Sequence, residues 1–382
     1  MKKKIFYWAP HFSKIATTKA VINSAFSLKK YSNKYDVSLI SSIGEWKDYE
    51  SDLYKKKINI IKLSRISLID NLPKNGFFLS RFSFIFIFIY FFFPLLKKIK
   101  FQKPDVLIIH LITSLPLILF LIFNIKRTKL ILRISGFTNL NIFRKLFWKL
   151  SNKVIYKIIC PTTETLNYLS EKNLFDKKKL ILIEDPAINI NEINILKKEK
   201  IDNNNFDSNN SLIAVGRLTE QKNFKFLINV FKKINITYPQ YKLFILGEGE
   251  QKKELTSLIE KLNLNNNIKL LGYQDNVFKY MFNSKFLISV SLYEDPGFSL
   301  LEAAACNISI ISSNVKSGPI DFLLNNNAGY LYKKNNNNDF LRAFTEANTH
   351  EDKRLERILN AKKKLKYYTK FHHFLKLNKI FM

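Results

Sequence analysis

Short apolar runs recur along the whole chain, separated by polar turns and by segments with helical spacing. In the first half these runs predict strands at 4–9, 37–41, 58–63, 105–110, 129–134, 155–161 and 180–183. In the second half they predict strands at 212–215, 241–246, 268–271, 286–290, 308–312 and 329–332. Helical spacing predicts helices between them, including 16–31, 224–235 and 255–262. Strands that alternate with helices indicate an α/β fold with parallel sheets, whose ligand sites lie at the carboxyl ends of the strands.

The chain length of 382 residues suggests two domains of ordinary size. We expect a first domain over 1–190, a polar and asparagine-rich linker over 191–210, and a second domain over 211–353. The tail at 354–382 is basic and aromatic, and we expect it to be helical. The opening residues predict the first strand rather than a signal peptide, because their apolar run is too short.

Residues 82–96 are almost all Phe and Ile and are followed by a cluster of lysines at 97, 98 and 100. This run is shorter than the roughly twenty apolar residues of a membrane-spanning helix. We expect a buried or half-buried helix of the first domain. The alternative is a helix that enters the membrane interface with its lysines at the headgroups. A second apolar run, 117–123, follows Thr113, Ser114 and Pro116, so strand, turn and helix are expected there rather than a span.

The formal net charge is +31, and most of the excess lies in the first half. Residues 1–200 carry 36 basic and 14 acidic side chains, whereas residues 201–382 carry 26 and 17. This favours attraction to an anionic surface, either nucleic acid or the cytoplasmic membrane leaflet. The abundance of Lys, Asn, Ile and Phe also fits the compositional drift of an AT-rich genome, and we attribute the larger share to drift.

The cysteines and histidines indicate no metal or disulfide chemistry. Cys160 and Cys306 are far apart and show no partner pattern, which favours a reducing compartment. The five histidines lack the spacing of metal ligands, so we expect no metal site.

Residues 286–306 combine a strand, a tight turn and the start of a helix. The apolar run 286–290 is followed by YEDPGFSLLEAAAC, in which Pro296 and Gly297 end the strand and helical spacing begins at Phe298. The N-terminus of such a helix has unpaired N–H groups and a positive dipole end, both of which suit a phosphate. Glu294 precedes the turn and Glu302 lies about one helical turn inside, so both carboxylates can face one ligand.

This stretch resembles the E-x7-E motif of the family 4 retaining glycosyltransferases. The preceding landmarks resemble the family in the same order: a strand and GRLTEQKN, a strand and GEG, a strand and LGYQDN. The resemblance covers 211–332 well and 1–185 only in general layout. It implies the GT-B fold, in which two Rossmann-like domains face each other across a cleft and a C-terminal helix returns to the first domain. The alternative for this stretch is an ordinary strand–helix unit with an acidic helix start.

The resemblance also implies roles for individual residues. Arg217 and Lys222 would hold the donor diphosphate and stabilise the departing nucleotide, and Glu294 would contact the donor sugar near the reacting carbon. Glu302 would accept hydrogen bonds from the ribose hydroxyls. The remaining donor contacts would come from backbone or the base-binding side: Gly216, Gly247, Tyr273, Gln274, Gly297, Phe298 and Ser299. No cofactor is implied beyond the nucleotide-sugar donor, of UDP or GDP type.

The first domain departs from the family pattern. Relatives often have a glycine pair after the first strand, whereas this chain has APHFSKIATTKA, with Ala16 and Thr17 as the small residues. Candidates for the acceptor side follow strands: His11, His110, Arg133 and Ser135. We place His110 in the catalytic set with Arg217, Lys222 and Glu294. In the second domain, Asp321 is a candidate ligand or a helix cap.

We therefore expect a retaining sugar transferase that builds a cell-surface glycan, such as lipopolysaccharide or capsule, at the cytoplasmic membrane face. Its expected partners are the nucleotide-sugar donor, a glycan or lipid-linked acceptor and a peripheral membrane surface, without nucleic acid. Three alternatives stay open: a GT-B sugar-nucleotide epimerase, a basic nucleic-acid binder and a multi-spanning membrane protein. The sequence does not specify the sugar, the base or the acceptor.

Overall fold

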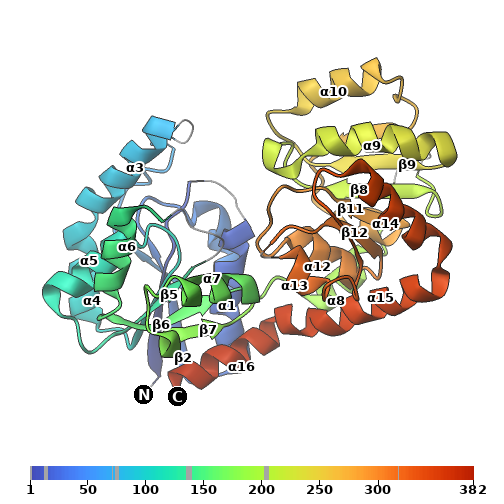
Figure 1. The fold of residues 1–382 in the computed structure, drawn as a ribbon. Coiled ribbons are helices and arrows are strands. Elements are labelled where there is room, and N and C mark those ends of the chain that lie inside the picture. Colours follow the sequence, from blue (N-terminus) through green and yellow to red (C-terminus); the bar gives the residue numbers. More distant parts are fainter. Residues whose placement is uncertain are drawn as a thin grey trace. The chain divides into compact units, whose positions relative to one another are not determined.

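The computed structural model describes residues 2–12, 16–70, 72–73, 77–134, 140–201, 206–316 and 318–382. The chain forms two compact units, shown in Figure 1. The first unit comprises Met1–Ala187 together with Lys370–Met382, and the second comprises Ile188–Thr369.

The first unit is built on a sheet of seven parallel strands in the order β3-β2-β1-β4-β5-β6-β7. Its strands are β1 (Lys3–Trp8), β2 (Tyr35–Ser41), β3 (Asn59–Lys62), β4 (Val106–Ile109), β5 (Lys129–Arg133), β6 (Ile155–Cys160) and β7 (Leu180–Leu182). Its helices are α1 (Ala16–Tyr31), α2 (Glu50–Lys55), α3 (Phe77–Tyr90), α4 (Phe92–Gln102), α5 (Ser114–Phe123), α6 (Ile142–Ser151), α7 (Thr163–Glu171) and α16 (Lys370–Phe381).

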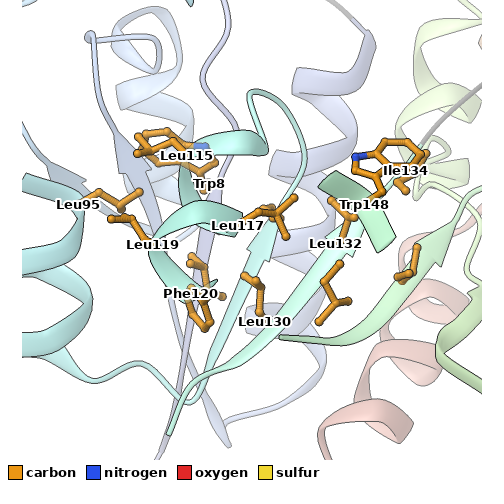
Figure 2. Packing of buried hydrophobic residues seen from close by; sticks show 14 of the residues in the cluster. Trp8, Leu95, Leu115, Leu117, Leu119, Phe120, Leu130, Leu132, Ile134 and Trp148 are labelled. Carbon is orange, nitrogen blue, oxygen red and sulfur yellow. The ribbon is translucent and has the colours of Figure 1, made fainter. Parts of the chain in front are cut away.

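Helices cover both faces of this sheet. Successive side chains of a strand point to opposite faces, and here both sets are apolar and need to be buried. Phe6 and Trp8 of β1 enter the cluster under α4, α5 and α6, whereas Ile5 and Tyr7 enter the cluster under α1 and α16. Figure 2 shows the first of these clusters, with side chains from the strands meeting those of the helices.

The expected single helix over 82–96 is two helices. α3 ends at Tyr90 and α4 begins at Phe92, and the two are bent by 46°. Pro94 explains the break, because in one continuous helix its ring would clash with the carbonyl of Tyr90. As the third residue of α4, Pro94 instead replaces an N–H that has no partner inside the helix. The helix is half-buried, which was one of the two expected forms: Ile87 of α3 is buried, whereas Phe82, Ile85 and Ile89 are exposed.

No helix of the described residues is by itself both long and apolar enough to cross a bilayer. The bent pair Arg81–Tyr90 and Phe92–Gln102 reaches that length and hydropathy only when its two members are taken together.

The second unit has a parallel six-stranded sheet in the order β10-β9-β8-β11-β12-β13. Its strands are β8 (Ser211–Val215), β9 (Lys242–Leu246), β10 (Ile268–Gly272), β11 (Phe286–Ser289), β12 (Ser309–Ser313) and β13 (Tyr330–Tyr332). Its helices are α8 (Ile190–Leu196), α9 (Phe224–Thr237), α10 (Lys252–Lys261), α11 (Phe278–Phe282), α12 (Phe298–Ala305), α13 (Pro319–Phe322), α14 (Asn337–Thr349) and α15 (Glu351–Leu365).

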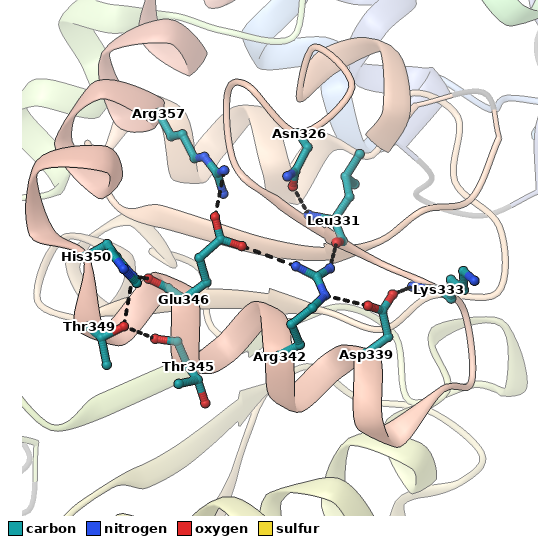
Figure 3. Close-up of polar contacts among 10 residues, drawn as sticks. All are labelled: Asn326, Leu331, Lys333, Asp339, Arg342, Thr345, Glu346, Thr349, His350 and Arg357. Atoms are coloured by element: carbon teal, nitrogen blue, oxygen red, sulfur yellow. Dashed lines mark hydrogen bonds and ion pairs between the residues drawn. The ribbon is translucent and has the colours of Figure 1, made fainter.

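Charged side chains fasten α14 to its neighbours, as Figure 3 shows. Arg342 donates to Asp339, to Glu346 and to the carbonyl of Leu331 in β13. Arg357 of α15 donates to the other oxygen of Glu346. These contacts join α14 to β13 and to α15.

The C-terminal helix returns to the first unit, as expected. Phe374 and Leu377 of α16 pack into the cluster beside α1, and the Tyr35 hydroxyl donates to Asn378 at 2.6 Å. The tail expected at 354–382 thus divides between α15 of the second unit and α16 of the first. The expected linker at 191–210 contains most of helix α8, whose Ile193 is buried.

Candidate functional site

The strand order places two loops of the second unit together. β8 and β11 are adjacent, yet the chain leaves them in opposite directions across the sheet, toward β9 and toward β12. This is the switch point of a doubly wound sheet, where ligands bind beyond the carboxyl ends of the strands. The loop after β8 carries Gly216 to Lys222, and the loop after β11 carries Val290 to Gly297. Both loops belong to the motifs singled out above.

An ion pair joins these two loops. The Lys222 ammonium contacts Glu294 Oε1, and the side chains are 16% and 8% exposed. Ser291 Oγ also donates to Glu294 Oε1 at 2.7 Å, and Ser313 Oγ donates to the carbonyl of Ser291 at 2.7 Å. The carboxylate of Glu294 is therefore oriented by a cation and a hydroxyl, which offsets the cost of burying its charge.

Backbone contacts hold the same loops in register. The N–H of Leu292 donates to the carbonyl of Gln221 at 2.8 Å, and Gln221 Nε2 donates to the carbonyl of Tyr293 at 3.0 Å. The position of Lys222 relative to Glu294 is thus fixed by the backbone as well as by charge.

Arg217 lies in the β8 loop and is exposed. Among the ion pairs of the described residues, none uses its guanidinium. An exposed guanidinium in the same loop as Lys222 can bind an anion through two N–H groups.

Two glycines let the β8 and β9 loops touch, and a third leaves room for Lys222. A Cβ at Gly247 would lie 1.9 Å from the carbonyl oxygen of Gly216, and one at Gly249 would lie 2.4 Å from that of Leu218. The N–H of Leu218 donates to the carbonyl of Glu248 at 2.9 Å. A Cβ at Gly216 would lie 2.9 Å from Lys222 Cε. The GEG sequence therefore supports the loop that carries Arg217 and Lys222.

Helix α12 begins directly after the β11 loop. Gly297 is its N-cap with φ +87°, a conformation that favours glycine, and Leu300 donates to the carbonyl of Gly297 at 3.0 Å. Phe298 and Ser299 are the first two residues of α12, so their N–H groups have no acceptor within the helix. Both residues are partly exposed. Glu302 lies in the next turn of α12 and is also partly exposed.

The residues expected at the base follow β10, at the edge of the sheet. Tyr273 is 70% exposed. Gln274 is held by its own surroundings, since its Nε2 donates to the carbonyl of Leu271 at 2.8 Å and its Oε1 accepts from the Tyr280 hydroxyl at 3.2 Å. Tyr273 is thus open to a ligand, whereas the Gln274 amide already has both a donor and an acceptor contact.

His110 follows β4 at the switch point of the first sheet. Both ring nitrogens are buried and, among the described residues, neither has a hydrogen-bond partner. Burial, then the positive charge of Arg133 and electrostatic coupling to His373, hold the pKa of His110 well below its usual range. The ring is therefore neutral at pH 7, with one donor and one acceptor for a polar ligand.

The other first-unit candidates have structural partners or lie outside the description. Arg133 forms a buried ion pair with Asp185, with its Nε 3.0 Å from Oδ1. The His11 ring packs edge-on to Trp46 at 4.8 Å, and its Nδ1 lies 3.0 Å from the carbonyl of Ala9. Ser135 lies outside the described residues. Ala16 and Thr17 open α1.

The expected ligand-or-cap residue Asp321 forms an ion pair with Lys364 of α15 at 3.3 Å. Among the described residues, no group of three or more His, Cys, Asp or Glu side chains could hold a metal ion.

Sequence reasoning missed a polar cluster in the first unit. The Nδ1 of His373 lies 2.8 Å from the carbonyl of Glu184, and its Nε2 lies 2.8 Å from Ser24 Oγ. The Tyr7 hydroxyl is 2.9 Å from the same Ser24 Oγ. One signal could have indicated this cluster: two adjacent carboxylates, Glu184 and Asp185, come directly after an apolar strand.

Comparison with known proteins gives matches along both units. Residues 197–364 match the family model described as glycosyl transferases group 1. An uncharacterized glycosyltransferase of Methanocaldococcus jannaschii is 36% identical over 252 residues, which are 60% of this chain and 61% of that protein. A second relative is the N-acetylgalactosamine-N,N'-diacetylbacillosaminyl-diphospho-undecaprenol 4-alpha-N-acetylgalactosaminyltransferase of Campylobacter jejuni. It is 29% identical over 56% of this chain and 58% of its own length. The chain thus spans about three fifths of these relatives.

Solved structures match the fold over the whole chain. A glycosyltransferase from Rickettsia africae superposes with a TM-score of 0.76 at 18% identity, covering 100% of this chain and 98% of that one. HepE of Anabaena, solved in complex with UDP, gives a TM-score of 0.74 at 14% identity and 99% coverage of both chains.

Proposed function

We propose that the chain is a retaining glycosyltransferase of family 4 type, because residues 197–364 match the family model of the glycosyl transferases group 1 and the chain has the GT-B fold. It moves a hexosyl group from a nucleoside-diphosphate donor of UDP or GDP type to a glycan or lipid-linked acceptor. The observation that carries the proposal is the Lys222–Glu294 pair at the switch point of the second sheet, in loops that also carry exposed Arg217 and lead into α12.

This arrangement suits a departing nucleoside diphosphate. When the bond from sugar to phosphate breaks, negative charge develops on the leaving oxygen. Arg217, Lys222 and the amides of Phe298 and Ser299 offer positive charge and N–H donors to that oxygen and its phosphate. Since Glu294 already fixes the Lys222 ammonium, its charge needs no reorganisation during the reaction, which favours the transition state over the ground state.

We propose the remaining donor contacts from the resemblance of the motifs to the family. We assign Glu302 of α12 to the ribose hydroxyls and exposed Tyr273 to the base. Gly247 lets the β8 and β9 loops approach closely, and Gly216 leaves room for the Lys222 side chain. Gly297 supplies the positive φ with which α12 begins. Glu294 faces the donor sugar, with Ser291 and Lys222 setting the direction of its carboxylate.

Retention needs no separate general base at the reacting carbon in this proposal, since the departing phosphate takes the proton of the acceptor hydroxyl. His110 is assigned to the acceptor side. Its neutral ring can donate one hydrogen bond and accept another, and neither nitrogen is used by the described residues.

The proposed product is a cell-surface polysaccharide, with lipopolysaccharide as one case, made at the cytoplasmic face of the membrane by a peripherally attached enzyme. Support comes from the names of two relatives, the undecaprenol-linked transferase of Campylobacter jejuni and the poly(ribitol-phosphate) alpha-N-acetylglucosaminyltransferase of Staphylococcus aureus.

The test is a thermal-shift screen of the full chain with UDP, GDP and ADP, because a ligand that binds only the folded state raises the unfolding temperature. We expect UDP or GDP to raise it and Arg217→Ala to abolish the rise, with Lys253→Ala on α10 as the matched control. NMR of the transfer product should then show the donor's anomeric configuration. Absence of any nucleotide response contradicts the proposal, and conversion of donor without acceptor favours the epimerase.

A further inference from the structure

Helices α3, α4 and α6 of the first unit expose an unusual number of large apolar side chains. Ile89 of α3 is 68% exposed, Phe93 of α4 is 71% exposed and Phe143 of α6 is 82% exposed. We call this the outer helical surface, and it comprises Phe82, Ile85, Ile89, Phe93, Phe101, Phe143, Leu146 and Leu150. Soluble proteins rarely expose large apolar patches without a binding partner.

These helices lie on the same face of the first sheet. Leu95 of α4, Phe120 of α5 and Trp148 of α6 all enter one buried cluster, which Figure 2 shows from close by. Because their inner sides are buried there, the residues of the outer helical surface point away from the sheet. The spacing 82, 85, 89 on α3 and 143, 146, 150 on α6 keeps those side chains on one side of each helix.

Cations border the apolar side chains. A groove of about 1110 Å³ lies beside α4, and its lining includes Arg65, Phe93, Lys97, Lys98, Lys100 and Phe101. Residues 81–151 contain 12 basic side chains and a single acidic one, Asp105. The Asp105 carboxylate already accepts from the N–H of Lys4 at 2.7 Å. The groove therefore combines aromatic walls with positive charge.

We propose that the outer helical surface docks on an anionic lipid bilayer. Its Phe and Ile side chains enter the boundary of headgroups and acyl chains, and the groove lysines meet lipid phosphates. The 46° bend between α3 and α4 suits two short helices that lie in the interface. The bilayer docking names the residues of the membrane attachment in the proposed function. The docking rests on that function only in assigning the surface to the cytoplasmic leaflet.

Charge and polarity decide between this and other occupants. A nucleic acid would satisfy the lysines but would leave the exposed Phe and Ile side chains in water. A second copy of the chain would cover the apolar side chains, but its lysines would lie against the lysines of the first copy and repel them. An anionic bilayer satisfies both requirements at once.

The test is co-sedimentation of the full chain with phosphatidylglycerol–phosphatidylcholine vesicles and with pure phosphatidylcholine vesicles. We expect binding to the anionic vesicles that weakens with salt. Lys97→Gln with Lys100→Gln should weaken it about fivefold for each lysine, and Phe93→Ser with Phe143→Ser about tenfold for each phenylalanine. The matched controls in the second unit are Lys253→Gln on α10 and Ile236→Ser on α9, both exposed.

Equal unfolding temperatures of the variants and the wild type show that folding is intact. Failure to bind anionic vesicles, or equal losses in the controls, overturns the proposal. Two further results overturn the proposal when vesicles are not bound. One is a salt-sensitive complex with duplex or single-stranded DNA. The other is a dimer that the Phe143→Ser variant no longer forms. The thermal response to UDP or GDP is measured on the same samples, so that loss of donor binding with vesicle binding intact contradicts only the proposed function.

Discussion

Lys222 and Glu294 are 72 residues apart in the chain, yet their side chains form a largely buried ion pair. The contact exists because β8 and β11 are neighbours in the sheet, so that the loops after them meet at one edge. Ser291 supports the same carboxylate oxygen from within the β11 loop. The proposed chemistry depends on this contact, because it fixes a cation and a carboxylate at the place where the donor would react.

We first predict that Lys222→Ala lowers transfer about 100- to 1000-fold, because a fixed cation at the leaving group is lost. The change also leaves the buried Glu294 carboxylate without its cation, which should reduce the free energy of unfolding by about 2 kcal/mol. Steady-state transfer kinetics and urea denaturation measure the two effects.

The matched control is Lys225→Ala. Lys225 pairs with Glu254, but both side chains are about half exposed, so its removal should change the free energy of unfolding by less than about 1 kcal/mol and leave transfer unchanged. If Lys222→Ala and Lys225→Ala behave alike, the Lys222 cation has no role at the donor.

The second prediction concerns Glu302. Glu302→Gln keeps the size of the side chain but removes the charge that would accept hydrogen bonds from the ribose hydroxyls. The dissociation constant for the bound nucleoside diphosphate should rise about tenfold or more, since a hydrogen bond to a charged group contributes about 1.5–3 kcal/mol. Isothermal titration calorimetry checks this, with Glu260→Gln on exposed α10 as the control. Equal affinity in both variants would contradict the ribose assignment.

Periodicity alone predicted most strands within one or two residues, and it predicted α1 with its observed bounds. It did not predict the break at Phe91, because a run of Phe and Ile is apolar on every side and gives no face to follow. Helix α6 was not expected either, although its apolar residues at 143, 146, 147 and 150 have helical spacing. The pattern could not show that Phe143 is exposed and Trp148 buried.

The candidate site, too, was predicted only in part from the sequence. The resemblance to the family's motifs indicated Arg217, Lys222 and Glu294 as ligands of one donor. The contact of Glu294 with Lys222 could not be predicted, because it depends on strand order, which the apolar pattern does not encode. For the same reason the sequence did not show that Gly247 lies against the carbonyl of Gly216, on a neighbouring strand's loop.

The third prediction follows from that glycine contact. Gly247→Ala should reduce the free energy of unfolding by about 2–4 kcal/mol, because a Cβ would lie 1.9 Å from the Gly216 oxygen and φ is +143°. It should also weaken nucleotide binding, since the displaced loop carries Arg217. Gly272→Ala is the control: there the nearest atom is the end of the Glu248 side chain, which can move. A smaller loss for Gly247→Ala than for Gly272→Ala would show that the loops do not touch.

The fourth prediction concerns pH and the helix that returns to the first unit. Burial lowers the pKa of His373 to about 4 from 6.5, against the smaller opposing effect of its hydrogen bond to Glu184. Between these two values the unfolded chain binds a proton that the folded chain does not. Stability is therefore complete above about pH 6.5 and falls as the pH falls toward 4. The lost free energy of unfolding at pH 5 is about 2 kcal/mol relative to pH 7.

Urea denaturation at pH 7 and pH 5 measures this loss, and comparison with His373→Gln isolates it from the titration of carboxylates. The variant should be less stable at pH 7, because the buried contacts with Ser24 and Glu184 are altered, but it should lose about 2 kcal/mol less between the two pH values. His350→Gln, at an exposed position, should keep the wild-type pH dependence. An unchanged difference between pH 7 and pH 5 in His373→Gln would mean that His373 is not the group that resists protonation, and that the attachment of α16 to α1 does not depend on its neutral ring.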